Sequence, residues 1–205
     1  MPENTMPMNL LILGVAVVGY FALHSILASP GAKDFLVQRL LPQRYYRLVF
    51  NALSVLLLLP LAWQFFPMKK VVVCEFMLRV PFAGWLLVAA GAGCMALAFR
   101  SYDLPEFTGI FQLKNGRPPE HETLSTGGLH ALVRHPLYFG TLLVAWGWFV
   151  ISPTDAVLLL AVLTSCYTCI GATLEERKLV RQFGEAYRSY QREVPMLLPF
   201  KRRKK

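Results

Sequence analysis

The sequence predicts an all-α integral membrane protein with about five transmembrane helices. Hydrophobic residues make up 55% of its 205 residues and charged residues only 16%, whereas a soluble domain carries about 25% charged residues. The hydrophobic residues also gather in long runs, and a bilayer core of about 30 Å needs about 20 helical residues to cross it. The composition therefore excludes a soluble domain, and it excludes a disordered chain because the chain is too apolar.

Five apolar runs are candidates for the membrane-crossing helices. They cover residues 9–27, 48–66, 80–99, 137–151 and 156–173. The first three have the usual length of a spanning helix, about 17–25 residues. The fourth has 15 residues, but the fifth begins shortly after it, so the two predict a helical hairpin. Pro60 lies inside the second run and predicts a kink there.

The first run is expected to remain in the protein rather than to be cleaved as a signal peptide. Residues 1–8 carry Glu3 and no Lys or Arg, whereas a signal peptide begins with positive charge. We therefore expect one membrane domain over 1–205. It would comprise a three-helix N-terminal part at 1–119, a C-terminal part at 120–200 and a short basic tail.

The basic residues predict the orientation of the chain. Segments 28–47, 100–136 and 174–205 carry 18 of the 21 Lys and Arg residues, and segment 67–79 carries three. Positive charge collects on the cytoplasmic side, so five spans place the N-terminus outside and the C-terminus in the cytoplasm, as in a bacterial inner membrane. This rule explains the basic excess without a nucleic-acid partner. The tail 201–205 fits an anionic lipid surface.

The first half of a candidate site precedes the fourth run. Pro136 suits the first turn of a helix, and the residue before a proline is driven towards an extended conformation. Arg134 and His135 are therefore expected at the cytoplasmic mouth of this helix, where free N–H groups favour a carboxylate or phosphate. Gly140 permits close approach of a ligand or of another backbone. Alternatively, Arg134 reaches lipid phosphates and His135 caps the helix.

The second half of the site follows the fifth run. Segment 174–194 predicts an amphipathic helix whose apolar face is formed by Leu179, Phe183, Tyr187, Tyr190 and Val194. Glu175 lies four residues before Leu179, so it is expected on the buried face, while residues 176–178 can face water. A buried carboxylate needs a cation or several donors. Its partner would be Arg134 or another base, or a ligand with an ammonium, a sulfonium or two ribose hydroxyls.

Other reactive residue types form weaker patterns. The four cysteines lie in or beside apolar runs, so no disulfide framework is expected, and the Cys166–Cys169 pair lies in the middle of a predicted span. The histidines and cysteines form no group with metal-ligand spacing, so no metal site is expected. Residues 45–47 are expected to be aromatic and basic anchors at the membrane interface.

These residues together resemble a known superfamily. Arg134-His135-Pro136-Leu137-Tyr138-x-Gly140, followed by two close spans and then Glu175-Glu176-x-x-Leu179-x-x-x-Phe183-Gly184-x-x-Tyr187-x-x-Tyr190, resembles the isoprenylcysteine carboxyl methyltransferases. Looser patterns at 24–25, 45–48 and 102–112 are similar to the bacterial branch, which includes NnrU-like proteins and methanethiol S-methyltransferases. The resemblance implies an integral membrane methyltransferase that uses S-adenosylmethionine and releases S-adenosylhomocysteine. It also implies that the C-terminal amphipathic helix covers a cofactor pocket on the cytoplasmic side.

The resemblance, with the helix-mouth argument, also gives a set of candidate site residues. The residues expected to contact the cofactor are Gln112, Glu122, Thr123, Leu124, Ser125, His130, Arg134, His135, Pro136, Leu137, Tyr138, Gly140 and Glu175. His130 stands where the family has a tyrosine. His130 and Tyr138 are candidates for accepting a proton, and no catalytic base is assigned. A thiolate acceptor needs little help from a base, since free thiols have a pKa of about 8.5.

One departure from the resemblance concerns the acceptor. Eukaryotic carboxyl methyltransferases place an arginine four residues before the glutamate pair, and Gly171 occupies that position here. A carboxylate substrate would lose its bidentate partner, so we expect a small or lipid-soluble acceptor, foremost a thiol such as methanethiol. The alternatives are a carboxyl or lipid methyltransferase, a non-catalytic NnrU-like protein, and a structural protein in which Glu175 pairs with a base. The expected partners are this acceptor and membrane lipid, with no obligate protein partner.

Overall fold

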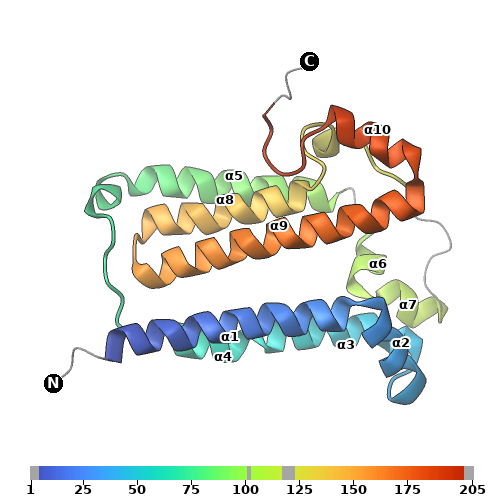
Figure 1. The fold of residues 1–205 in the computed structure, drawn as a ribbon, viewed down its shortest axis with the longest axis horizontal. Helices are drawn as coiled ribbons and strands as arrows, with labels where there is room; N and C mark the ends of the chain where they lie inside the picture. The colour runs from blue at the N-terminus through green and yellow to red at the C-terminus, as the bar shows by residue number, and fades with distance from the viewer. Residues whose placement is uncertain (1–4, 101–102, 117–122, 201–205) are drawn as a thin grey trace. The chain divides into compact units, whose positions relative to one another are not determined.

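The computed structural model describes residues 5–100, 103–116 and 123–200, and their regular structure is helical. The chain divides into two compact units, which are described separately. The first consists of Met1–Val71 with Tyr102–Glu122, and the second of Val72–Ser101 with Thr123–Lys205. Figure 1 shows the course of the helices within each unit.

The helices confirm the predicted all-α class and give four candidate spans. Within the described ranges, the helices long and apolar enough to cross a membrane are Met8–Ala28, Gln43–Phe65, Pro81–Phe99 and Asp155–Phe183. The fourth predicted run forms the shorter apolar helix Pro136–Ile151. At about 1.5 Å per residue its 16 residues extend about 24 Å, less than a bilayer core of about 30 Å. The prediction that five helices cross the membrane, with the helix at 136–151 as one of them, is therefore not confirmed.

The first unit is built from six helices among its described residues. They are α1 (Thr5–Ala28), α2 (Pro30–Arg39), α3 (Gln43–Leu56), α4 (Leu58–Phe65), α6 (Leu104–Thr108) and α7 (Ile110–Asn115). The break between α3 and α4 agrees with the expected kink, because Pro60 has no N–H to donate to the carbonyl of Leu56. Asn51 on α3 donates to the carbonyls of Phe107 and Thr108, each at 3.1 Å, and so fixes α6.

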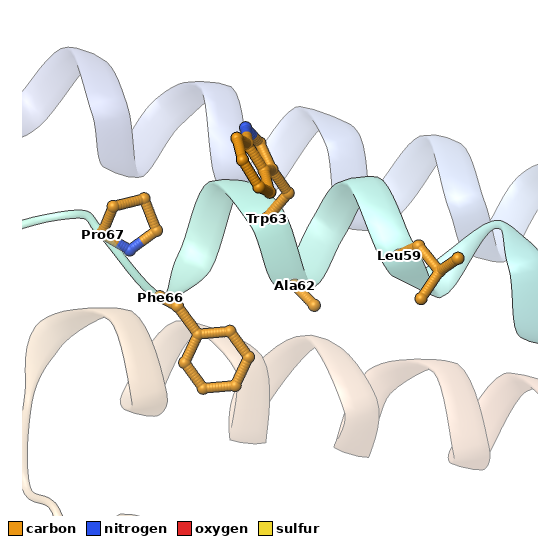
Figure 2. A pocket seen from close by; sticks show the side chains of 5 residues that line it. All are labelled: Leu59, Ala62, Trp63, Phe66 and Pro67. Atoms are coloured by element: carbon orange, nitrogen blue, oxygen red, sulfur yellow. The ribbon is translucent and has the colours of Figure 1, made fainter.

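Polar contacts and an apolar groove complete this unit. Nδ1 of His24 lies 3.0 Å from Oγ of Ser54, which joins α1 to α3. The hydroxyl of Tyr46 donates to the carbonyl of Leu27, so this predicted interface anchor also ties the two helices together. Figure 2 shows the apolar groove along α4, where Trp63 is among the most exposed side chains. Such exposed aromatic surface on a candidate spanning helix is suited to contact with lipid.

The second unit contains the hairpin that the sequence predicts. Its elements are η1 (Glu75–Arg79), α5 (Pro81–Phe99), η2 (Gly128–Ala131), α8 (Pro136–Ile151), α9 (Asp155–Phe183) and α10 (Glu185–Glu193). The turn between Ile151 and Asp155 joins α8 to α9 and confirms the helical hairpin. The N–H of Val73 donates to the carbonyl of Pro153 at 2.8 Å and anchors the loop before η1 to this turn.

Helices α5 and α8 approach closely at two pairs of glycines. A Cβ on Gly140 would lie 2.8 Å from the carbonyl oxygen of Gly91, and a Cβ on Gly147 would lie 2.8 Å from that of Gly84. Only glycine allows backbones to come this near. Of the two expected reasons for Gly140, close approach of another backbone is the one that the structure shows.

The end of α9 differs from the prediction. The sequence predicts one helix over 174–194, directly after the fifth run, whereas α9 continues from that run to Phe183 and α10 follows. The break falls at Gly184, whose φ of +58° favours glycine. Of the residues predicted to form the apolar face, Tyr187 and Tyr190 are buried in α10. In Figure 1, α10 turns back from the end of α9.

Candidate functional site

The candidate site is centred on the residues that lead into α8. His135 is the N-cap residue with φ of −122° and ψ of 70°, and Pro136 occupies the first helical turn. This confirms that the proline begins the helix. The side chain of His135 makes no capping hydrogen bond. Instead, its ring stacks on Tyr138 one turn later, with ring centroids 5.4 Å apart and an interplanar angle of 11°.

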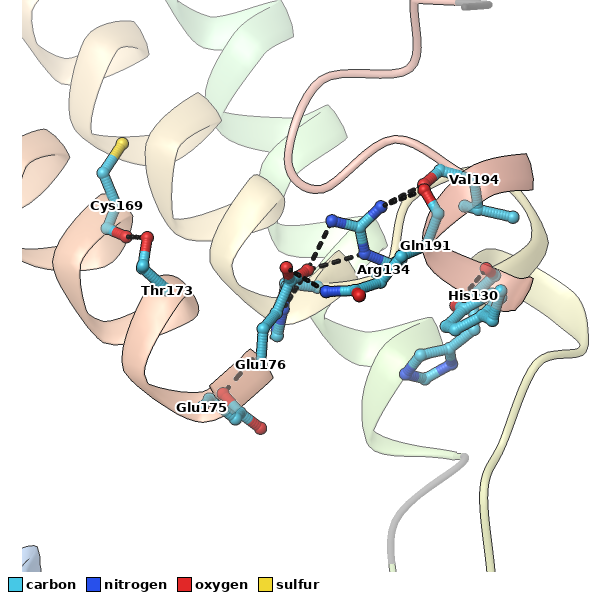
Figure 3. A network of polar contacts seen from close by, with 10 residues as sticks. His130, Arg134, Cys169, Thr173, Glu175, Glu176, Gln191 and Val194 are labelled. Atoms are coloured by element: carbon cyan, nitrogen blue, oxygen red, sulfur yellow. Dashed lines mark hydrogen bonds and ion pairs between the residues drawn. The ribbon is translucent and has the colours of Figure 1, made fainter. Parts of the chain in front are cut away.

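Arg134 is enclosed by protein and does not reach lipid. Its side chain is 7% exposed, and its Nε and Nη2 lie 2.6 Å and 2.5 Å from Oε1 of Glu176. Its Nη1 donates to the carbonyl of Gln191 at 3.1 Å and to that of Val194. The alternative in which Arg134 reaches lipid phosphates is therefore wrong. Figure 3 shows this guanidinium held between α9 and the residues at the end of α10.

The two neighbouring glutamates have exchanged the roles that the sequence predicts. The side chain of Glu176 is 12% exposed and that of Glu175 is 42% exposed, so the prediction that Glu176 faces water is wrong. The predicted face assumed one helix through 174–194, whereas the break at Gly184 changes the direction of the chain before Tyr187. The apolar face of α10 therefore does not continue the face of α9 that turns towards Arg134.

His135 lies between the two carboxylates. Its Nδ1 is 3.6 Å from Oε2 of Glu175, and its Nε2 is 3.4 Å from Oε1 of Glu176. Figure 3 shows Glu175 pointing away from Arg134 at the edge of this network. Glu175 therefore combines a contact with His135 with an accessible carboxylate.

His130 presents a buried nitrogen with no partner. The hydroxyl of Tyr190 donates to the carbonyl of His130 at 2.5 Å, while the ring Nδ1 has no hydrogen-bond partner in the part of the chain that the structure describes. Burial lowers the pKa of His130, and its electrostatic interaction with His135 lowers it further, which favours the neutral form of the ring. A buried nitrogen without a partner costs about 1–3 kcal/mol, so this atom marks a place for a donor or acceptor from a ligand or water.

The two tyrosines of α10 enclose the same region. Burial raises the pKa of Tyr190 to about 12 and also raises the pKa of Tyr187. Both hydroxyls therefore stay protonated at neutral pH and can donate hydrogen bonds. Their rings pack edge to face, with centroids 5.8 Å apart.

The other predicted site residues are more scattered. Thr123, Leu124 and Ser125 lie in the irregular segment before η2, and Leu137 lies in the first turn of α8. Gln112 lies in α7 of the first unit, buried, and its Oε1 has no hydrogen-bond partner in the described ranges. Glu122 falls outside the described residues.

Two contacts of the network were not predicted from the sequence. Gln191 donates from Nε2 to Oε2 of Glu176 at 2.8 Å, and the carbonyl of Val194 accepts from Arg134. A backbone carbonyl has no side-chain signature, so nothing in the sequence pointed to Val194. The sequence identified the adjacent pair Glu175-Glu176, but it did not show which of the two side chains is buried.

Comparisons with known proteins identify the family of the chain. The family model described as Phospholipid methyltransferase matches residues 80–186. Methanethiol S-methyltransferase of a Pseudomonas species is 35% identical over 97% of this chain and 76% of its own length, and Methanethiol S-methyltransferase 1 of Bradyrhizobium diazoefficiens is 31% identical over 97% and 70%. Protein-S-isoprenylcysteine O-methyltransferase of Schizosaccharomyces pombe is 28% identical over 63% and 58%.

No solved structure matches the chain. The family model covers α5, α8 and α9 and ends at the second residue of α10. The two methanethiol S-methyltransferases cover nearly the whole chain and, with the isoprenylcysteine O-methyltransferase, confirm the resemblance to the bacterial branch of the isoprenylcysteine carboxyl methyltransferase superfamily. The chain therefore belongs to the phospholipid methyltransferase family and is an integral membrane methyltransferase.

Proposed function

We propose that this methyltransferase transfers the methyl group of S-adenosylmethionine to a small thiol, with methanethiol as the leading acceptor. The observation that carries the proposal is the polar cluster at the start of α8. In it, the buried Nδ1 of His130 has no hydrogen-bond partner among the described residues, and the carboxylate of Glu175 is accessible. The names of the methanethiol S-methyltransferases, which match almost the whole chain, support the choice of acceptor.

The residues present fit such a cofactor. When bound, S-adenosylmethionine supplies a methyl group already activated on a sulfonium. Glu175 offers a carboxylate to a cationic or hydroxyl group, and Nδ1 of His130, to which no described residue is hydrogen-bonded, offers one further polar contact. The stacked rings of His135 and Tyr138 provide a flat wall at the first turn of α8. We propose that Thr123, Leu124, Ser125, Pro136 and Leu137 complete the contacts within the second unit and that Arg134 and Gly140 shape the site.

The surroundings of Gly171 favour a small acceptor. A Cβ at this position would meet only the hydroxyl of Tyr138, at 4.0 Å, so the position leaves open space beside that ring. The guanidinium of Arg134 is already occupied by Glu176 and two carbonyls. Neither residue offers a cation to a carboxylate acceptor, which a bidentate arginine would bind. A thiol needs no such partner.

The residues of the site would orient the acceptor and exclude water. The methyl donor is already activated, so the main remaining requirement for transfer is to hold the methyl group and the thiol in line. The neutral ring of His130 can accept the proton of a thiol, and Tyr138 is the alternative acceptor. The buried tyrosines of α10 shield this region from solvent, so we propose that α10 covers the cofactor pocket.

We further propose that α8 crosses the membrane as a fifth span. Four spans would leave both termini on one side, whereas five spans place 18 of the 21 basic residues on the side of the C-terminus. This arrangement puts the N-terminus outside and the site at the cytoplasmic face, in a bacterial inner membrane. The acceptor and membrane lipid are then the expected partners.

The experiment is an assay of the purified full chain in detergent with S-adenosylmethionine and methanethiol. We expect dimethyl sulfide by gas chromatography and saturable binding of S-adenosylhomocysteine by calorimetry. Glu175→Gln should remove both, because it takes the charge from the accessible carboxylate. Methylation of phosphatidylethanolamine or of a farnesylcysteine analogue, with no thiol product, would refute the thiol as acceptor. Folded wild-type protein without S-adenosylhomocysteine binding would refute the cofactor.

A further inference from the structure

Two adjacent carboxylates at the end of α9 have different surroundings. Glu175 is half-exposed, whereas Glu176 is enclosed by Arg134, His135 and Gln191. We propose that Glu176 is a positioning residue that, with Arg134, fastens residues 190–197 over the start of α8. These residues are called the C-terminal strap below. The proposal rests on the proposed function, because what the strap positions is the proposed cofactor site.

Arg134 connects the strap to α9. Its Nη1 donates to the carbonyls of Gln191 and Val194, while its Nε and Nη2 both contact Oε1 of Glu176. One guanidinium therefore holds two strap carbonyls and one α9 carboxylate in a fixed geometry. Gln191 also donates from Nε2 to the second oxygen of Glu176 at 2.8 Å. The same carboxylate thus holds the strap directly and through Arg134.

Backbone hydrogen bonds extend the attachment to the residues before α8. The N–H of Arg134 donates to the carbonyl of Pro195 at 2.9 Å, and the N–H of His135 donates to that of Met196 at 3.2 Å. On the other side of the site, the hydroxyl of Tyr190 donates to the carbonyl of His130 at 2.5 Å. Both histidines of the proposed site are therefore in segments whose backbone is bonded to the strap.

The charge of Glu176 is required for this arrangement. Arg134 is buried, and a buried cation whose partner is removed is strongly destabilising. Without the carboxylate, the guanidinium would move towards water and release the two strap carbonyls. Oε1 of Glu176 also lies 3.4 Å from Nε2 of His135. Loss of Glu176 would therefore disturb the site both through the strap and at the histidine ring.

The test compares Glu176→Gln with its matched neighbour Glu175→Gln in the full chain purified in detergent. Trypsin reports on the strap, because Arg188 and Arg192 are exposed but helical, and cleavage after them requires α10 to open locally. Calorimetric titration with S-adenosylhomocysteine reports on the site. For Glu176→Gln we expect cleavage at least ten-fold faster than in the wild type and binding at least ten-fold weaker.

Ligand protection separates positioning from loss of folding. If the site forms only when the strap is docked, saturating S-adenosylhomocysteine must favour docking and restore resistance to trypsin in Glu176→Gln. Its KM for the methyl donor should rise more than its kcat falls. Glu175→Gln should resist trypsin like the wild type. It should bind S-adenosylhomocysteine weakly although its strap is docked. Tyr190→Phe removes one hydroxyl contact to His130 and should shift cleavage and binding in the same direction, by less.

The outcomes are distinguishable. A strap that opens in Glu176→Gln while affinity stays at the wild-type value would overturn the positioning role, as would equal trypsin resistance of the two glutamate variants. If Glu176→Gln does not fold, wild-type cleavage and affinity in Tyr190→Phe would overturn it as well. Wild-type protein that binds no S-adenosylhomocysteine would overturn the proposed function and the positioning role with it.

Discussion

Gly91→Ala should lower the stability of the protein, and Gly93→Ala should not. Both residues lie in α5, two positions apart. A Cβ at Gly91 would lie 2.7 Å from the carbonyl oxygen of Gly140, 2.9 Å from Cγ2 of Val144 and 3.0 Å from Cβ of Leu143. A Cβ at Gly93 would meet nothing within 4 Å. The pair therefore isolates the contact between α5 and α8 from the change of residue type.

The magnitude follows from the distances. A carbonyl oxygen of the backbone cannot move aside as a flexible side chain can, so α5 and α8 must separate by about 0.5 Å to relieve the contact at 2.7 Å. Overpacking of this kind costs about 1–3 kcal/mol. The higher helix propensity of alanine returns up to about 1 kcal/mol at either position. The expected net change is about 1–2 kcal/mol of destabilisation for Gly91→Ala and a small stabilisation for Gly93→Ala.

The assay is thermal unfolding of both variants in the same detergent. For a chain of this size, 1 kcal/mol corresponds to about 2–4 °C in Tm, so Gly91→Ala should unfold about 2–8 °C below the wild type. Gly93→Ala should unfold at or slightly above it. A Gly91→Ala protein as stable as Gly93→Ala would refute the reasoning that the glycines exist for close approach of the two helices.

Three further perturbations test other features of the second unit. Arg134→Gln should cost about 3–5 kcal/mol in denaturant unfolding, because it leaves Glu176 buried without its cation; a loss below 1 kcal/mol would contradict the pairing. Since the pKa of His130 is lowered in the folded state, its contribution to stability is present above its ordinary pKa of about 6.5 and lost as pH falls through the folded value. Tm should therefore fall on acidification, with a weaker pH dependence in His130→Gln; an unchanged dependence would show that other groups cause it. Gly184→Ala should cost about 1–3 kcal/mol at φ of +58°, measured as a drop in Tm; unaltered Tm would mean that the turn relaxes freely.

The elements that sequence reasoning predicted are those with local causes. Pro136 begins α8 because it lacks an N–H, and the turn before Asp155 makes a hairpin of two apolar runs. The break at Gly184 was missed because the apolar spacing from Leu179 to Tyr190 fits one continuous helix. A glycine reveals its positive φ only when the direction of the chain on both sides is known.

The candidate site shows the same limit. Its histidines and both glutamates could be identified from their order in the sequence, but the partner of Arg134 could not. The sequence places Glu175 on the buried face and leaves its partner open between Arg134, another base and a ligand, whereas tertiary packing pairs Arg134 with Glu176, 42 residues away. The roles of the two carboxylates depend on this choice, which helical periodicity alone does not determine.

The two glycine contacts between α5 and α8 also fix the position of α8 along the axis of α5. Gly84 and Gly91 are seven residues apart, as are Gly140 and Gly147, and each glycine of one helix meets a glycine of the other. Sliding α8 along α5 to the next equivalent match would require about 10.5 Å, since each residue rises about 1.5 Å. Thermal motion of packed helices covers far less than this. Because Pro136 starts α8 one turn before Gly140, the level of His135 along the axis of this helix pair is set by the packing of the two helices, whatever the sequence of the loop before it.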